Sequence, residues 1–277
     1  MSVRTAVKTW MLNRCEVDLR ENFQMSTMGR YAENDVFIVG YPKSGNTWVQ
    51  YLLSAAKYGV DPSRVKDSLV QRLVPDIYYH DYYIRWQDQM EFKSHEPPSA
   101  GYRNVIYLLR DGRDVMASYI RFLSKLHGDA FDLNKMLRTG KAPFPYQWPE
   151  HVAAWLANPY DARMLVIRYE SLKEDCAREL ESMCRFLGVD CPTEECQLIA
   201  ERASFDRMKA RELRNGWANQ EWPANETFCG KGEVGGFRQS FEEHDLDGFM
   251  ERAGPVLRQC GYLDVSMTAV DRAGGCP

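Results

Sequence analysis

Short apolar runs alternate along this chain of 277 residues with longer segments whose apolar side chains recur at helical spacing. The runs that we interpret as strands are residues 36–39, 105–109 and 164–167. Strands separated by helical patterns are typical of a parallel sheet with covering helices. The sequence therefore predicts an α/β fold, a single domain with a central parallel β-sheet flanked by helices.

Each predicted strand is followed by a predicted helix with signals at its ends. Residues 47–57 carry a buried stripe that stops at Gly59, and Asp111 is a plausible N-cap for a helix that runs through Phe122. After the third strand, Ser171 and Glu174 form a predicted capping box. The buried stripe of that last helix ends at Gly188 and consists of Leu172, Leu180, Met183 and Leu187.

No linker or internal repeat divides the chain. We expect an N-terminal segment, 1–34, that packs on the domain, a domain over 35–263 and a flexible tail over 264–277. The basic residues near the N-terminus are typical of an amphipathic first helix, and a transit peptide is the alternative.

Composition excludes some classes of partner. The net charge of −4 gives no general attraction to nucleic acid or to an anionic membrane, so any cationic site must be local. The eight cysteines form no CxxC pair, and neither a secretory signal nor a long apolar span is evident, which favours a reducing, cytoplasmic location. Cys191 and Cys196 could be half a metal site, but scattered thiols are the simpler interpretation, and we expect no metal.

Residues 40–47, Gly-Tyr-Pro-Lys-Ser-Gly-Asn-Thr, have the frame of a phosphate-binding P-loop between a strand and a helix. In nucleoside triphosphatases a lysine follows the second glycine, where this chain has Asn46, and Lys43 lies inside the loop instead. The loop amides can still hold an anion at a helix N-terminus. The sequence therefore predicts a P-loop-like site for a nucleotide whose 5′ anionic group is not a triphosphate.

Parallel sheets bind ligands beyond the carboxyl ends of their strands, which singles out Lys43, Arg110 and Tyr169. Ser118 falls on the helix after Arg110, where its hydroxyl could share an anion with the guanidinium. A surface ion pair and a capping hydroxyl are the alternative interpretation of Arg110 and Ser118.

Six segments in collinear order resemble motifs of the cytosolic sulfotransferase family, over most of the chain. Residues 41–48 are similar to the 5′-phosphosulfate loop, which commonly has threonine in place of Asn46. Residues 93–97, Lys-Ser-His-Glu-Pro, resemble the Lys-Thr-His-Leu-Pro segment that holds the catalytic histidine. The other four resemble the 3′-phosphate strand and helix, the segment after the next strand, the stretch against adenine and the closing loop, at 110–118, 168–173, 204–208 and 231–241.

The resemblance implies the fold of the sulfotransferases and transfer of a sulfuryl group from 3′-phosphoadenosine-5′-phosphosulfate (PAPS) to a hydroxyl or amine, with PAP as product. His95 would be the general base, Lys43 would stabilise the leaving phosphate and Lys93 would face the sulfuryl oxygens. No metal is demanded, because lysine and loop amides already neutralise the leaving group. The expected donor-binding residues are Lys43, Ser44, Gly45, Asn46, Thr47, Trp48, Arg110, Ser118, Tyr169, Ser204, Phe205, Met208, Lys231 and Gly232.

The chain departs from the family pattern in two places. Gly230 replaces the arginine of the closing loop, so we expect weaker discrimination for the 3′-phosphate. The segment 238–244 replaces the family's Lys-x-Phe-Thr-Val dimer contact, so we expect a monomer or a homodimer of another type.

Aromatic side chains before His95 and in a second loop resemble the family's acceptor pocket and favour a phenol, a sterol or a lipid-like alcohol, although they could simply cover the core. The expected lining residues are Tyr78, Tyr79, Tyr82, Tyr83, Phe144, Tyr146 and Trp148. Two other classes stay open, a P-loop kinase or nucleoside triphosphatase and a nucleotide-binding relative without turnover. Asn46 argues against the first, and His95 with its lysines argues against the second.

Overall fold

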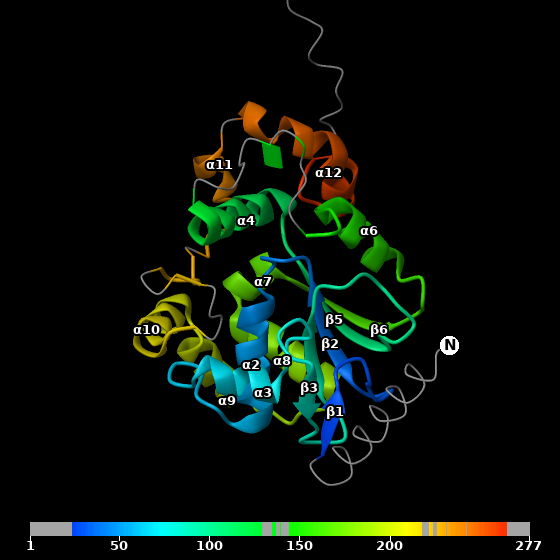
Figure 1. Ribbon diagram of the computed structural model, residues 1–277, viewed down its shortest axis with the longest axis vertical. Helices are drawn as coiled ribbons and strands as arrows, with labels where there is room; N and C mark the ends of the chain where they lie inside the picture. Colours follow the sequence, from blue (N-terminus) through cyan, green and yellow to red (C-terminus); the bar gives the residue numbers. More distant parts are fainter. Residues whose placement is uncertain are drawn as a thin grey trace, which may run out of the picture.

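A computed structural model describes residues 24–128, 135–136, 139, 144–217, 222–223, 226–230, 232–241 and 243–264. Its centre is a parallel sheet of four strands in the order β4-β2-β5-β6 (Figure 1). The strands are β2 (Val36–Gly40), β4 (Glu91–Ser94), β5 (Asn104–Leu109) and β6 (Arg163–Arg168). The three predicted strands are confirmed, and β4 was not predicted as a strand in its own right.

Helices cover both faces of this sheet, so the molecule has three layers. In β2 the side chains of Val36 and Ile38 belong to one core cluster, and those of Phe37 and Val39 belong to the other. Because both of their faces are buried, the central strands β2 and β5 are nearly continuous apolar runs, whereas the edge strand β4 has the sequence Glu-Phe-Lys-Ser. The predicted α/β fold is confirmed.

The helices on the first face are α2 (Asn46–Tyr58), α7 (Tyr169–Glu174), α8 (Cys176–Leu187) and α9 (Thr193–Arg202). The opposite face packs against α4 (Gly112–His127), α6 (Trp148–Ala157) and α12 (Asp247–Gln259). The remaining elements are α3 (Asp67–Leu73), α10 (Phe205–Asn215), α11 (Phe237–Ser240), the 3₁₀ helix η2 (Glu243–Leu246) and the antiparallel pair β1 (Met25–Thr27) and β3 (Tyr82–Ile84).

The ends of α2 and α4 agree in part with the sequence. Gly59 ends α2 in the left-handed conformation, with a φ of 68°, as predicted. The Asp111 side chain accepts a hydrogen bond from the Arg113 amide at 2.9 Å, so the predicted N-cap of α4 is confirmed. The predicted end at Phe122 is wrong, because no helix breaker occurs before Gly128 and Leu123 is still buried in the core.

The capping box predicted after the third strand is wrong. Ser171 lies inside the short helix α7 and Glu174 is its last residue, while Asp175 caps the next helix by accepting from the Arg178 amide at 3.0 Å. The predicted stripe is nevertheless buried in full, and Gly188 ends α8 with a φ of 71°. The apolar periodicity was therefore informative, but it did not reveal the break between two helices.

Among the described residues, no helix combines the length and the apolar character that crossing a membrane requires. Residues 1–23 and 265–277 lie outside the described part of the chain. The predicted domain boundaries, the N-terminal segment and the tail therefore stay predictions.

Candidate active site

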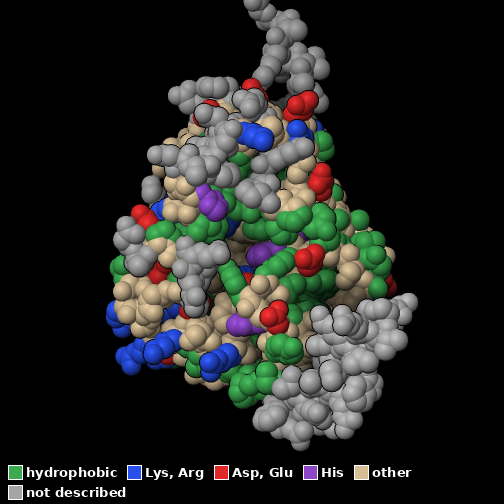
Figure 2. All heavy atoms as spheres, in the orientation of Figure 1, with side chains coloured by type: hydrophobic (Ala, Val, Ile, Leu, Met, Phe, Trp, Pro, Cys, Tyr) green, Lys and Arg blue, Asp and Glu red, His purple; other side chains and the backbone are tan. Residues whose placement is uncertain are grey.

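A cavity of about 520 Å³ opens beyond the carboxyl ends of β2, β4 and β5, where an open parallel sheet binds its ligands. In Figure 2 the molecule is hollowed near the centre of the face in view, among histidine and hydrophobic side chains. The structure brings most of the predicted site residues to the cavity wall. These are Lys43, Gly45, Asn46, Thr47, Trp48, Lys93, His95, Arg110, Ser118, Tyr169, Phe205, Met208 and Gly232.

Two of the described donor-binding candidates, Ser44 and Ser204, do not line this wall. Ser44 is buried in the loop, and its hydroxyl has no hydrogen-bond partner within the described structure. Ser204 precedes α10 without capping it through its side chain. Lys231 lies outside the described residues.

The loop between β2 and α2 lies in the cavity wall and leads into the N-terminus of α2. Lys43 and Gly45 both have positive φ, 72° and 105°, on either side of Ser44. Alternation of this kind produces an anion-binding nest, here at the N-terminus of a helix. A side chain at position 45 would also collide with Tyr169, whose Cδ2 would be 2.9 Å from the added Cβ. Glycine is thus required at position 45 for two reasons: the positive φ of the turn and the close approach of the Tyr169 ring.

Asn46 shows why this loop is not a triphosphate site of the usual type. Its side-chain amide donates to the carbonyl oxygens of Gly40 and Ser94, at 3.3 Å each. The residue in the position of the triphosphatase lysine therefore ties the ends of β2 and β4 together.

Lys43 is held in an aromatic cage. Its Nζ lies 4.1 Å from the ring centroid of Phe122 and 4.0 Å from that of Phe228. Burial, reinforced by the nearby cations Lys93, Arg121 and Arg110, holds its pKa well below the usual value. An anion in the cavity would reverse this effect, because it would stabilise the ammonium form.

His95 directly follows β4 and is oriented by the backbone of β2. Its Nδ1 lies 2.6 Å from the Gly40 carbonyl oxygen. A carbonyl can only accept, so in the neutral ring Nδ1 carries the proton and Nε2 is an acceptor. Burial and Lys93 lower the pKa of His95 to about 4, which keeps the ring neutral at physiological pH.

Helix α6 fixes the segment that carries His95. The Nε2 of His151 lies 3.0 Å from the His95 carbonyl oxygen, and the Trp155 indole donates to the Glu96 carbonyl at 3.0 Å. Tyr107 lies 3.2 Å from the other ring nitrogen of His151. The sequence neighbourhood of His151 contains no signal for this role, since its partners come from β5 and the segment after β4.

Lys93 is paired, which sequence reasoning missed. Its Nζ lies 2.7 Å from Asp76 Oδ2, and both side chains are buried. Burial alone would lower the pKa of Lys93, but Asp76 raises it overall, so the ammonium stays charged. The segment around Asp76 pairs with β4, because the amides of Lys93 and Ile77 donate to Pro75 and Lys93 carbonyls at 2.8 and 3.1 Å.

Two arginines line the cavity beside Ser118. Arg110 donates to the Lys43 and Glu233 carbonyls at 3.0 and 3.1 Å, while its Nε is buried without a partner in the described structure. Arg121 lies three residues after Ser118, which places both on one face of α4. The Arg121 guanidinium lies so close to Gly230 that a Cβ there would collide with it.

Aromatic rings form the remaining wall. Trp48 and Tyr169 meet edge to face with centroids 6.1 Å apart, and the Trp48 indole donates to the Ala203 carbonyl at 2.9 Å. Gly232, with a φ of 62°, lies against Phe205, whose ring would be 2.8 Å from an added Cβ. The segment at 232–237 is secured by Asp114, which accepts from the amides of Gly235 and Phe237 at 2.7 and 3.0 Å.

The predicted acceptor cluster is divided by the fold. Tyr79 lines the cavity, and Tyr78 and Phe144 contact the His95 ring with centroids 5.9 and 6.2 Å away. Tyr146 is exposed and packs on Phe144.

The other three predicted acceptor residues lie elsewhere. Trp148 is 1% exposed and packs in the core against Gly112 and Phe249, so its assignment to the acceptor pocket is wrong. Tyr82 and Tyr83 belong to β3, where Tyr83 points into the core and Tyr82 to solvent. Alternate residues of a strand face opposite sides, so the two could not both line one pocket.

Comparison with known proteins identifies the family of the chain. The family model for the sulfotransferase domain matches residues 33–261. Sulfotransferase 1 family member D1 of Rattus norvegicus is 28% identical over 244 residues, which cover 79% of this chain and 81% of that protein. Sulfotransferase 2A1 of Homo sapiens is 27% identical over 205 residues, which cover 66% of this chain and 69% of that protein.

Solved structures share the fold. Retinol dehydratase in complex with androsterone and PAP gives a TM-score of 0.63 at 20% identity, with 83% of this chain and 82% of that chain covered. Mouse sulfotransferase SULT7A1 complexed with PAP gives 0.61 at 21% identity, with 84% and 86% covered. The family match spans most of the chain and agrees with the resemblance of the motifs. The chain therefore belongs to the sulfotransferase family.

Proposed function

We propose that this sulfotransferase moves the sulfuryl group of PAPS to a hydroxyl of a small, apolar acceptor, with His95 as general base and Lys43 as the cation at the leaving phosphate. The observation that carries this proposal is the joint placement of a neutral imidazole and a buried ammonium on one cavity wall, next to an anion-binding loop. PAP bound to structural neighbours supports the choice of donor.

The donor would lie along the wall from the loop to α4. Its 5′-phosphosulfate would meet the amides at the start of α2, from Gly45 to Thr47, where the helix dipole favours negative charge. Its 3′-phosphate would meet Arg110 and Ser118. The purine would lie among Trp48, Tyr169, Phe205 and Met208, which already form an apolar wall.

The reaction needs one proton transfer and one displacement at sulfur. As the acceptor oxygen bonds to sulfur, the bond from sulfur to the bridging phosphate oxygen breaks, and the acceptor proton moves to His95 Nε2. Negative charge then grows on the phosphate oxygen, where Lys43 stabilises it. Lys93, still charged beside Asp76, would stabilise the sulfuryl oxygens.

The low pKa of His95 sets the pH dependence. In the free enzyme the neutral base is lost only as the pH falls through about 4, so we expect kcat/KM for an alcohol acceptor to show no loss from protonation of His95 between pH 8 and about pH 5. His95→Ala should lower kcat by about 10²- to 10⁴-fold across this range. The assay is transfer of labelled sulfuryl, with far-UV circular dichroism to confirm folding at each pH. If the kcat of His95→Ala equalled that of the wild type, His95 would not be the general base.

Lys43→Met tests the role of the caged ammonium. We expect kcat to fall by about 10²- to 10³-fold, because charge on the leaving oxygen develops only in the transition state. The dissociation constant for PAP, measured by calorimetry, should change much less, since loop amides and arginines still bind the phosphates. Lys125→Met is the control, because the Lys125 side chain pairs with Glu226 at 2.6 Å and does not itself line the cavity. If affinity fell and kcat did not, Lys43 would be a binding residue only.

Arg121 changes the expectation drawn from Gly230. The absence of a side chain at position 230 leaves the space that the Arg121 guanidinium occupies, and Arg121 shares a helix face with Ser118. Burial and the nearby charge of Arg110 lower the pKa of Arg121, as expected where two cations lie close together without an anion between them. We infer that Arg121 supplies the guanidinium that the closing loop lacks.

Arg121→Leu should therefore reduce the preference for PAP over adenosine 5′-phosphate by about 10- to 100-fold, the worth of a charged hydrogen-bonded pair. Arg121→Lys should restore only part of it, because an ammonium cannot form the bidentate contact. The double variant Arg121→Ala/Gly230→Arg should recover more of the preference for PAP than Arg121→Lys does. If Arg121→Leu left this preference unchanged, Arg121 would not bind the 3′-phosphate, and Arg110 and Ser118 would be its proposed partners.

The acceptor would approach His95 between Tyr78, Tyr79 and Phe144. These rings favour a flat, apolar alcohol such as a phenol or a sterol. Androsterone and retinol, named with one structural neighbour, are apolar alcohols of this class. A cytoplasmic location and a monomer, or a homodimer that does not use the family's usual contact, remain our predictions from the sequence.

A panel of phenols, sterols, alkylamines and sugars, assayed with labelled donor, tests this choice. We expect phenols or sterols to exceed sugars by at least about 10-fold in kcat/KM, from burial of apolar area alone. Phe144→Ala should raise KM for the best acceptor while the PAP dissociation constant stays the same. Preference for sugars would contradict the apolar assignment.

A further inference from the structure

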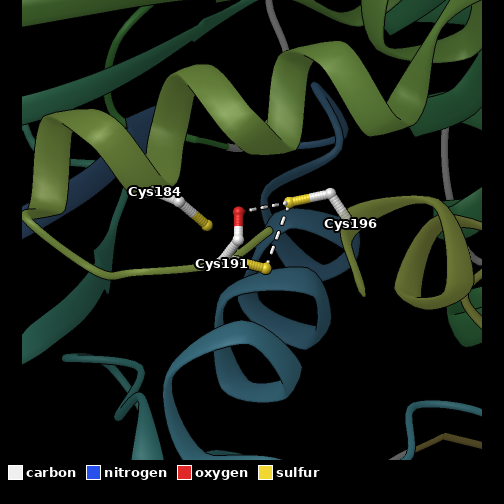
Figure 3. Close-up of side chains that lie close together, drawn as sticks. All are labelled: Cys184, Cys191 and Cys196. Atoms are coloured by element: carbon white, nitrogen blue, oxygen red, sulfur yellow. Dashed lines mark hydrogen bonds between the residues drawn. The ribbon is translucent and has the colours of Figure 1, made fainter. Parts of the chain in front are cut away.

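Three cysteines converge at the joint between α8 and α9 (Figure 3). Cys184 lies on α8, Cys191 in the connecting segment and Cys196 on α9. Their Sγ atoms all lie within 4.8 Å of one another, and those of Cys191 and Cys196 are 3.1 Å apart. Scattered thiols, which we had expected, are therefore not what the structure shows.

We propose that Cys184, Cys191 and Cys196 bind a thiophilic d¹⁰ metal ion, Zn²⁺ or Cu⁺, as thiolates. A Zn–S bond of ~2.3 Å places tetrahedral sulfur ligands about 3.8 Å apart. The Sγ atoms of Cys191 and Cys196 are 3.1 Å apart and the other pairs are no more than 4.8 Å apart, so the site needs adjustments of about 1 Å or less. Thiolate ligands select these ions over Mg²⁺ and Ca²⁺, which prefer oxygen.

The surroundings provide both an enclosed site and an entrance. Cys184 and Cys196 are buried in the core cluster shared by α8 and α9, whereas Cys191 is partly exposed. An ion can therefore enter beside Cys191 and reach the two buried sulfurs. Its bonds would join the two helices and the segment between them.

Charge balance favours Zn²⁺ over Cu⁺. Three thiolates leave a net charge of −1 around Zn²⁺ and −2 around Cu⁺, and the carboxylates of Glu195 and Glu181 act on Cys184 and Cys196 from nearby. In the part of the chain that the structure describes, no fourth Cys, His, Asp or Glu joins the group. Water would complete a tetrahedral zinc site, and Cu⁺ would remain three-coordinate.

The site is separate from the catalytic cavity, since none of the three cysteines lines it. It does lie at the start of the chain segment that leads through α9 to Ala203, whose carbonyl accepts from Trp48. The metal would thus stabilise α9 and, through the Ala203 carbonyl, the position of Trp48 in the proposed donor wall. This inference does not depend on the proposed acceptor or on the proposed catalytic residues.

The test uses the purified full chain, reduced and stripped of metal with a chelator. Co²⁺ is titrated as the spectroscopic probe, Zn²⁺ is then added to displace it, and Cu⁺ is titrated separately against a Cu⁺-selective chelator. We expect one ion per chain and thiolate-to-cobalt charge-transfer absorption that Zn²⁺ abolishes. Cys191→Ser, at the partly exposed ligand, should lose this absorption. Cys176→Ser, at a cysteine that lies on α8 like Cys184 but outside the cluster, should retain it.

Thermal unfolding provides the second readout. Zn²⁺ at 100 times its dissociation constant should raise Tm by about 5 °C in wild type and in Cys176→Ser, and by much less in Cys191→Ser. Binding of Cu⁺ alone would support the site and identify its ion. Absence of stoichiometric binding by either ion, or equal binding by Cys191→Ser, would overturn the proposal. The proposal would also be overturned if the stripped chain took up no metal under reducing conditions and two of these thiols formed a disulfide in air.

Discussion

The carbonyl group of Gly40, at the carboxyl end of β2, is the contact on which the site depends. It accepts from His95 Nδ1 at 2.6 Å and from the Asn46 side chain at 3.3 Å, so one oxygen fixes both the proposed base and the start of the anion-binding helix. β2 can end there because Gly40 has no side chain, since an added Cβ would be 2.8 Å from the Leu108 carbonyl oxygen. The ring orientation, the tautomer and the position of the loop therefore follow from the packing of β2 against β5.

The cavity gathers several cations that repel one another, although the chain as a whole has a net charge of −4. The fold offsets this repulsion differently for each cation. Lys93 is neutralised by Asp76, and Lys43 is placed between two aromatic faces that attract a cation without adding a negative charge. Arg110 is held by carbonyl oxygens. Of Lys43, Lys93 and Arg110, Lys93 is the one that forms a salt bridge with a carboxylate among the described residues, so a bound polyanion would meet cations that are already oriented and still short of counter-charge.

Local apolar runs predicted the sheet, and the resemblance of short motifs to those of the sulfotransferase family indicated most of the residues that line the proposed donor wall. Apolar runs mark strands buried on both faces, and the loop motif lies within eight consecutive residues. The roles of His151, Asp76 and Arg121 could not be predicted, since each depends on a partner from a distant element, the His95 carbonyl, Lys93 and Gly230 respectively. Trp148 shows the opposite error, because an aromatic residue near a predicted pocket was a core residue.

The two halves of the site differ in how they are built. The donor half consists of strand ends and helix starts, whose positions are determined by backbone hydrogen bonds of the sheet and by α2. The proposed acceptor half consists of side chains such as Tyr78 and Phe144, whose rings contact the His95 ring by stacking and by an edge-to-face contact. Substitutions in the acceptor half can therefore reshape the pocket without moving the base, because His95 is oriented from behind by Gly40 and through its carbonyl by His151. Acceptor choice can thus change in this fold while the donor chemistry stays the same.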